Sequence, residues 1–357
     1  MRGRFIQVLL FAALVVAIQL LTKVTDSSYH LIQLTMTAYY SLLIIGLCML
    51  IGYAGQISLG HAGFFCIGGY VAAFLTTHDL APYKANYFVS VLARSGILTV
   101  RPGLYGGDLL TVQPWASCLI AILTALAIAW IVGGPVLKLK GHYLAMATLG
   151  FGIIIYRIVL GTTALGAADG ISDVPPLRVL PGVDISGSMS ARVMNYYVAW
   201  GLVIAGVFLL LNLIHSRVGR ALSAIHGAED AAEAMGIPTA RYKLNTFVLS
   251  AVFAAIAGVL LTHYNGGIGP SEASVMKSVR YVAIVAIGGM ANLWGSLFMS
   301  LILNYLSLRG YFGTYDDAIF GSILILIMLF APDGLLRRSV IGDLKLLISG
   351  DVKEDGV

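Results

Sequence analysis

The sequence has few charged residues. Among its 357 residues, 22 are Lys or Arg and 17 are Asp or Glu, so 11% of the chain is charged, whereas about 25% is usual in soluble proteins. Hydrophobic residues make up 59% of the chain, and its mean hydropathy is +0.89. A soluble globule cannot bury so much apolar surface, and a disordered chain is far more polar. The composition therefore predicts an integral membrane protein.

Other shortages exclude further classes of protein. The net charge is only +5, and no run of five or more basic residues exists, which argues against nucleic-acid binding. Cys48, Cys66 and Cys118 lack metal-ligand spacing, and we interpret them as small buried hydrophobic residues. The chain also lacks a phosphate-binding loop, a zinc-protease motif and a histidine cluster. We therefore expect no catalytic residue, metal site or cofactor on this chain.

The spacing of the charged residues predicts the membrane segments. A spanning helix needs about 20 residues at about 1.5 Å each, and residues 27–78, for example, contain no charge. We expect an all-α polytopic membrane protein with about ten segments, of which the third, eighth and ninth are short enough to be partly re-entrant. Their bounds are about 5–22, 31–51, 64–77, 115–133, 142–160, 193–214, 244–264, 281–288, 296–308 and 318–331.

The topology follows from the first segment and from the basic residues. The first apolar run, of about 18 residues, is too long for a secretory signal and has no small-x-small cleavage site after it, so we expect a retained helix. An even number of segments puts both termini on one side, which the basic residues identify as cytoplasmic. The connectors 78–113 and 161–192 then lie outside. We divide the chain into an N-terminal helix with its connector (1–30), a transmembrane domain (31–338) and a cytoplasmic tail (339–357).

Arg157 is the only charged residue inside these predicted segments. It lies near the outer end of its helix, so an anchor that reaches the headgroups and a functional role are both open. All acidic residues lie outside the segments, which argues against transport coupled to protons.

Two glycine-rich stretches interrupt the predicted helices. Residues 52–63 contain four glycines interleaved with polar residues, and residues 288–295 form the second stretch. Unwound backbone at membrane depth is tolerated only against protein or a water-filled cavity. Paired interruptions are typical of inverted repeats around a path, although glycines also serve close helix packing and His61 can be a hydrogen-bonded packing residue. We favour a path-lining role for Gly55, Gln56, Ser58, His61, Tyr143, Thr148 and Asn292.

Residues 216–238 predict a short amphipathic helix on the cytoplasmic side. Apolar and small residues recur there near helical spacing, and Gly236 followed by Pro238 is a typical helix stop. Such a helix can lie on lipid or insert its small-residue face into a partner protein. Its mixed charge favours the partner.

Four stretches resemble the branched-chain amino acid ABC permeases of the LivH/LivM type, a family that includes relatives for urea and short amides. They are residues 52–70, 139–152, 229–236 and 331–336, and the resemblance extends over about 31–338. The Leu-x-Gly-x-Tyr pattern from Leu139 to Tyr143 resembles the LivM branch. The chain departs from the family pattern at Cys48, Ile153 and His226, and its 78–113 connector is enlarged, which leaves the substrate open.

The resemblance implies an importer subunit of the bacterial inner membrane that moves branched-chain or related hydrophobic amino acids by alternating access. The family pairs it with a second, LivH-like permease, two cytoplasmic ATPases that hold ATP and Mg, and an external solute-binding protein. Residues that dock in the ATPase would be Glu229, Asp230, Ala231, Ala232 and Gly236. The alternatives are a urea or short-amide permease, a passive channel for a small neutral solute, and a scaffold subunit whose path carries no solute.

Overall fold

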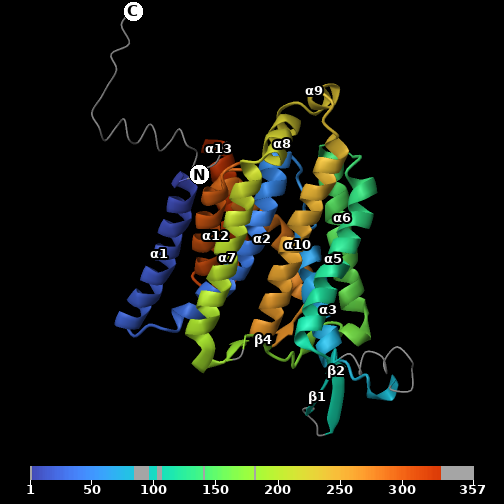
Figure 1. The fold of residues 1–357 in the computed structure, drawn as a ribbon, viewed down its shortest axis with the longest axis vertical. Helices are drawn as coiled ribbons and strands as arrows, with labels where there is room; N and C mark the ends of the chain where they lie inside the picture. Colours follow the sequence, from blue (N-terminus) through green and yellow to red (C-terminus); the bar gives the residue numbers. More distant parts are fainter. Residues whose placement is uncertain (1, 84–95, 103–106, 140, 181, 331–357) are drawn as a thin grey trace, which may run out of the picture.

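The computed structural model describes residues 2–83, 96–102, 107–139, 141–180 and 182–330 (Figure 1). The predicted cytoplasmic tail, 339–357, and the family-like stretch 331–336 lie outside the described residues. So does the middle of the enlarged 78–113 connector.

Long helices make up most of the described chain, which confirms the all-α class. Each predicted segment overlaps one helix of the bundle in Figure 1. Among the described residues, six helices are long and apolar enough to cross a membrane, namely α1, α2, α5, α6, α7 and α10, whereas α3, α11, α12 and α13 are shorter. The bounds are α1 (Arg2–Val24), α2 (His30–Cys48), α3 (His61–Thr77), α5 (Pro114–Val136), α6 (His142–Gly161), α7 (Arg192–Ile214), α10 (Thr239–Asn265), α11 (Val275–Gly288), α12 (Leu293–Leu308) and α13 (Asp316–Phe330).

The two ends of the bundle differ. One end carries the short helices α8 (Arg217–Gly227) and α9 (Glu229–Ala234), and we call it the α9 end; α1 begins there and α13 ends there (Figure 1). The opposite, hairpin end carries small antiparallel sheets, most of whose strands come from the two long connectors. The pairs are β1 (Leu98–Pro102) with β2 (Asp108–Val112), β3 (Ile171–Ser172) with β6 (Gly267–Ile268), and β4 (Leu177–Leu180) with β5 (Val183–Ile185).

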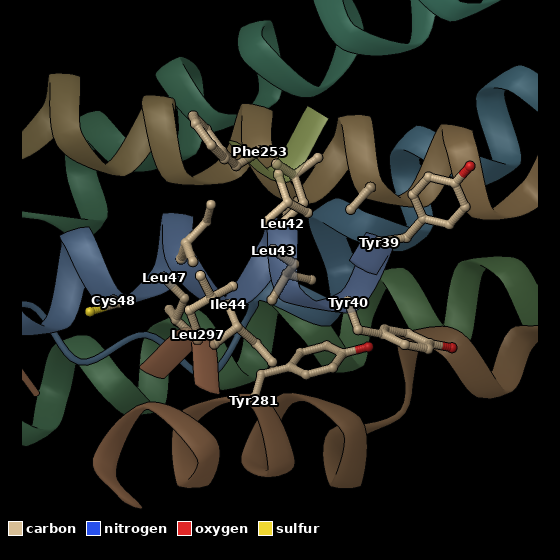
Figure 2. Packing of buried hydrophobic residues seen from close by; sticks show 14 of the residues in the cluster. Tyr39, Tyr40, Leu42, Leu43, Ile44, Leu47, Cys48, Phe253, Tyr281 and Leu297 are labelled. Atoms are coloured by element: carbon tan, nitrogen blue, oxygen red, sulfur yellow. The ribbon is translucent and has the colours of Figure 1, made fainter. Parts of the chain in front are cut away.

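Helix α2 lies at the centre of the bundle. It is apolar on all sides, as a fully enclosed helix must be, and almost all of its side chains are buried. Figure 2 shows Leu43 and Leu47 of α2 packed between Phe253 of α10 and Leu297 of α12. Cys48 and Cys66 are buried, as expected, whereas Cys118 is partly exposed.

Small residues bring α3 and α10 into close contact. A Cβ atom added at Gly258 would lie 2.0 Å from the carbonyl oxygen of Phe65, and one added at Gly68 would lie 2.4 Å from that of Ala255. Membrane helices associate without a hydrophobic driving force, so close backbone approach of this kind supplies van der Waals contact instead. The glycines of these two helices therefore set the spacing at the core of the bundle.

The structure corrects the placement of charges. Helix α11 begins at Val275, six residues before the predicted segment, and so includes Lys277 and Arg280. Arg157 is therefore not the only charged residue in the helices of the bundle. It is exposed near the hairpin-end terminus of α6, where an anchoring side chain is expected.

Ion pairs explain why α11 tolerates its two basic residues. Lys277 pairs with Glu272, just before the helix, and Arg280 pairs with Asp316 and Asp317 at the start of α13. A charge in an apolar layer is tolerated when it is paired. Because each pair joins residues from different elements, the spacing of charges along the sequence could not reveal it.

Candidate functional site

The first interruption follows α2 at the α9 end. Helix α2 continues as the π-helical turn Met49–Tyr53, and regular helix resumes only at His61. Gly55 has a φ of +66°, a left-handed conformation that favours glycine. π-helical turns inside helices are frequent at functional sites. The sequence therefore specifies the unwound stretch, residues 55–60, through its local backbone conformation.

Side chains of neighbouring helices satisfy the backbone of the unwound stretch. The amide of Leu59 donates to Thr148 Oγ1 of α6 at 3.0 Å, and the amide of Ala62, just after the stretch, donates to Ser278 Oγ of α11 at 3.3 Å. Such partners are what irregular backbone at membrane depth requires. Thr148 is thus a support for the stretch, and its side chain is buried.

Ser58 and His61 belong to a buried hydrogen-bond chain. Ser58 Oγ lies 3.0 Å from His61 Nδ1, and His61 Nε2 lies 2.8 Å from Ser250 Oγ on α10. All three side chains are buried, with His61 only 1% exposed. This geometry favours the packing interpretation of His61, because both ring nitrogens already have partners.

Gln56 differs from its neighbours. Its side chain is buried, yet its amide nitrogen and oxygen have no hydrogen-bond partner among the described residues. Gly55 and Ile57 on either side are exposed. A buried polar group without a protein partner points to water or a ligand as its partner. Gln56 is therefore the predicted path residue whose surroundings best fit that role.

The other two predicted path residues are on different elements. Tyr143 is 73% exposed in the first turn of α6. Asn292 caps α12, where its side-chain oxygen accepts from the amide of Gly295 at 3.1 Å. The structure thus brings Ser58, His61 and Thr148 into one buried network and leaves Tyr143 outside it.

The two glycine-rich interruptions contact each other. Tyr53 donates from its hydroxyl to the carbonyl of Ala291 at 2.9 Å, and the thiol of Cys48 lies 3.6 Å from the carbonyl oxygen of Met290. Both interruptions therefore lie at the α9 end. An inverted repeat would place corresponding stretches at opposite ends, so the pairing of these two stretches as counterparts is wrong.

Residues 266–274 are the stretch that mirrors the first interruption. They follow the long α10 and contain Gly266, with a φ of +69°, and the 3-10 turn Pro270–Ala273. Helix α11 has 14 residues, or about 21 Å, whereas the helix from His30 to Tyr53 has 24, or about 36 Å. Both helices end where the two interruptions contact each other, and the longer helix begins at the hairpin end. The difference in length therefore places the start of α11 about 15 Å short of the hairpin end. This second unwound stretch therefore enters the bundle from the hairpin end.

The contact between the interruptions predicts a sensitive glycine. A Cβ atom at Gly52 would lie 1.5 Å from the carbonyl oxygen of Met290, so Gly52→Ala must displace the turn before α12. We expect the free energy of unfolding to fall by about 1–3 kcal/mol, measured as a lower melting temperature of the purified protein. Gly150→Ala is the matched control, because nothing lies within 4 Å of its added Cβ. Equal melting temperatures for the two variants would contradict the prediction.

The predicted cytoplasmic helix is two helices. Ala228 is extended, with φ −158° and ψ 97°, and separates α8 from α9. Gly236 has a φ of +81° after the end of α9, which confirms the predicted stop. Glu229 forms an ion pair with Lys243 and so ties α9 to α10.

The surface of α9 is small and exposed. Helix α9 stands beyond the ends of the long helices (Figure 1), with Asp230, Ala231 and Ala234 exposed and Met235 83% exposed. Ala232 is buried against the bundle. Helix α8 lies against the first interruption, since a Cβ added at Gly55 would be 2.8 Å from Nδ1 of His226. The α8–α9 unit therefore joins an exposed surface to the unwound stretch.

Sequence reasoning missed several polar residues of the site. Ser250 and Ser278 carry no signal in the sequence, because a serine in an apolar helix has no distinctive spacing. Glu272 and Lys277 do have a signal in the sequence, because they follow a long charge-free run and a glycine-rich stretch. In the part of the chain that the structure describes, no group of three or more His, Cys, Asp or Glu side chains is placed to hold a metal ion.

Comparison with known proteins identifies the family. A family model described as branched-chain amino acid transport system / permease component matches residues 30–331. The chain belongs to this family. As a transport permease it is not an enzyme.

Individual relatives agree with this family. The LivM permease of the high-affinity branched-chain amino acid transport system of Salmonella typhimurium is 31% identical, over 92% of this chain and 74% of its own. LivM of Escherichia coli K12 is also 31% identical, over 85% and 68%. LivH of Salmonella typhimurium is 28% identical, over 85% and 93%. No solved structure matches the chain.

Proposed function

We propose that this permease moves branched-chain or related hydrophobic amino acids inward, as a subunit of an ATP-binding-cassette importer. The relatives named above are permeases of branched-chain amino acid transport systems, which supports the substrate class. The observation that carries the ATP-driven mechanism is the α8–α9 unit. Its exposed tip has the small residues that suit a groove on a motor protein, and its base contacts the unwound stretch at Gly55.

The proposed coupling depends on how firmly α9 is attached. The ion pair between Glu229 and Lys243 fixes the start of α9 to α10, and the left-handed Gly236 fixes where α9 ends. A push on the exposed surface at Ala231 is then passed to α10 and, through His226, to the stretch after α2. Asp230 and Ala232 complete the docking surface, the first as an exposed contact and the second as its buried support.

The interior suits a neutral or zwitterionic solute. Gln56 supplies an amide that has no partner among the described residues, and helix ends and unwound backbone supply further polar groups. We place the path beside Gln56, with Gly55, Ser58, His61, Tyr143, Thr148 and Asn292 as its further proposed members. Among these, Ser58, His61 and Thr148 act by holding the stretch in place.

The proposal implies a larger assembly. It contains a second, LivH-like permease, two ATPases that bind ATP and Mg, and an external solute-binding protein. We propose that the α9 end faces the cytoplasm of a bacterial cell, that both termini are cytoplasmic, and that the hairpin end faces the binding protein. The basic residues near α8 and the start of α10 support this orientation by the positive-inside rule.

Uptake by the reconstituted assembly tests the function. The permease is reconstituted in liposomes with its partner permease, ATPases and binding protein, and uptake of radiolabelled leucine and of urea is measured with and without ATP. We expect ATP-dependent uptake of leucine. Flux without ATP would show a passive channel, and uptake of urea in place of leucine would overturn the substrate class. Gln56→Leu and Ser58→Leu should reduce uptake, and unchanged uptake would identify a scaffold whose path carries no solute.

A further inference from the structure

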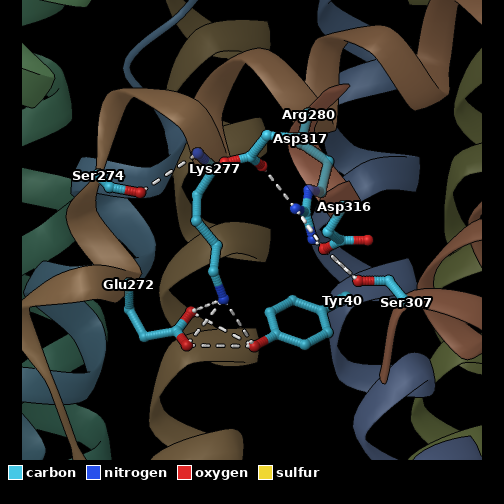
Figure 3. Close-up of polar contacts among 8 residues, drawn as sticks. All are labelled: Tyr40, Glu272, Ser274, Lys277, Arg280, Ser307, Asp316 and Asp317. Carbon is cyan, nitrogen blue, oxygen red and sulfur yellow. Dashed lines mark hydrogen bonds and ion pairs between the residues drawn. The ribbon is translucent and has the colours of Figure 1, made fainter. Parts of the chain in front are cut away.

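A charged cluster lies where the second unwound stretch enters the bundle. Lys277 Nζ lies 2.9 Å from both carboxylate oxygens of Glu272 and 3.2 Å from the hydroxyl of Tyr40 on α2 (Figure 3). The Tyr40 hydroxyl lies 3.3 Å from the same carboxylate. Lys277 is in the first turn of α11, which begins well inside the bundle. One positive and one negative group therefore meet at membrane depth.

The Lys277–Glu272 pair is partly exposed. The side chains of Lys277 and Glu272 retain 26% and 18% exposure, whereas Tyr40 is buried. Exposure alone does not distinguish this pair from the ion pairs of Arg280, whose side chains retain 15% (Arg280), 25% (Asp316) and 53% (Asp317). The two clusters differ instead in the charges and partners that they bring together.

Two further hydroxyls border the cluster without partners. Tyr281 of α11 and Tyr70 of α3 are each at least 97% buried, and neither hydroxyl has a hydrogen-bond partner among the residues described. The Tyr281 ring centroid lies 6.2 Å from that of Tyr40, and Figure 2 shows its hydroxyl directed toward Tyr40. Tyr70 packs in an apolar cluster with Ala273, the residue after Glu272. Buried hydroxyls without partners point to a ligand or water that completes them.

The other charged cluster of α11 provides a contrast. Arg280 binds Asp316 at 2.6 Å, Asp317 at 2.8 Å and Ser307 at 3.0 Å (Figure 3). This arrangement joins α11 to α12 and α13 and uses three partners from one cation, as a structural clamp does. The Lys277–Glu272 pair, by contrast, has one charge of each sign, matched to a zwitterion.

We propose that Lys277 and Glu272 bind the two charged ends of the transported amino acid. The carboxylate of the substrate replaces Glu272 at the Lys277 ammonium, and its ammonium group replaces Lys277 at the Glu272 carboxylate. Tyr40 donates to the substrate carboxylate, and Tyr281 is a second donor beside it. In the absence of substrate the two side chains neutralise each other, as they do here. This inference rests on the proposed function, because it assumes an amino acid as substrate.

A double neutral variant tests the binding role. Glu272→Gln with Lys277→Met removes both charges and leaves neither one unpaired, so a purely structural pair would tolerate it. We expect leucine uptake by the complete transporter to fall at least 10-fold, with ATPase assembly and melting temperature unchanged. The matched control neutralises the other cluster, by Arg280→Met with Asp316→Asn and Asp317→Asn, and should keep uptake within about threefold of the native rate in complexes that assemble.

Protection from a thiol reagent gives a second test that does not need transport. Ser271→Cys, at an exposed position next to Glu272, keeps both charged residues. In a chain whose native cysteines are replaced by alanine, it forms a mixed disulfide with a cationic methanethiosulfonate, and millimolar leucine should slow this reaction at least threefold. Met276→Cys, at a 51% exposed neighbouring position, should react at a rate that leucine does not change. Equal reaction rates at position 271 with and without leucine would overturn the inference.

The two proposals fail in different ways. If the native transporter takes up no leucine, the proposed substrate is wrong. If the native transporter takes up leucine and the double neutral variant does so at a similar rate, only the role of Lys277 and Glu272 is wrong.

Discussion

Ala231→Arg is expected to abolish leucine uptake while the permease stays folded. Ala231 is exposed on the tip of α9, and a long charged side chain there cannot enter a groove shaped for alanine. A surface substitution changes the free energy of unfolding by only about 0.5 kcal/mol. We therefore expect at least a 10-fold loss of ATPase in the co-purified complex, and uptake at background level, with an unchanged melting temperature.

Two further variants separate docking from local folding. Ala231→Ser keeps the small size and should retain the ATPase. Gly236→Val places a β-branched residue at a φ of +81°, a conformation that costs a non-glycine residue about 1–2 kcal/mol, and Glu229→Arg breaks the ion pair with Lys243. Both should weaken ATPase binding by displacing α9. Full ATPase binding and uptake by Ala231→Arg would show that α9 is not the docking element.

Gly258→Ala is expected to disrupt the bundle itself. The added Cβ would lie 2.0 Å from the carbonyl oxygen of Phe65 and 3.2 Å from the amide of Gly69, so backbone meets it on the α3 side. A turn can shift to admit a methyl group, but two packed helices must separate along their length. We expect a loss of about 3 kcal/mol or more in the free energy of unfolding, seen as aggregation or as a greatly lowered melting temperature after purification.

Gly201→Ala is the matched control for this prediction. Gly201 is also inside a long helix, α7, but nothing lies within 4 Å of its added Cβ. This variant should melt like the native protein. If Gly258→Ala also melts like the native protein, the close α3–α10 contact does not determine the stability of the bundle.

Most of the bundle was predictable because charges are excluded from the membrane. Gaps between charged residues located every long helix, and α5, α6 and α7 begin and end within a few residues of the predicted bounds. The start of α11 was not predictable by this rule. The charges of Lys277 and Arg280 predict that both residues lie outside the membrane segment. Their partners Glu272, Asp316 and Asp317 allow the helix to begin before them.

The candidate site was predictable only in part. Glycines interleaved with Gln56, Ser58 and His61 marked the first unwound stretch correctly, because irregular backbone in a membrane needs such residues. The counterpart of this stretch was wrongly assigned to 288–295. The glycines near Gly266 lie between two predicted membrane segments, so the sequence presents them as part of a connector. Only the lengths of α10 and α11 reveal that this connector enters the bundle. The partners of His61 were also hidden, because contact with Ser250 depends on how α3 and α10 cross.

The stretch after α2 has a mechanical consequence for any movement of the bundle. It and the start of α3 hydrogen-bond to three helices, through Thr148 of α6, Ser250 of α10 and Ser278 of α11. A buried hydrogen-bonding group that loses its partner costs about 1–3 kcal/mol. Moving any of these helices away from the stretch therefore costs free energy. Helices α6, α10 and α11 are therefore expected to shift as one body at this level, with sliding confined to surfaces that the stretch does not hold.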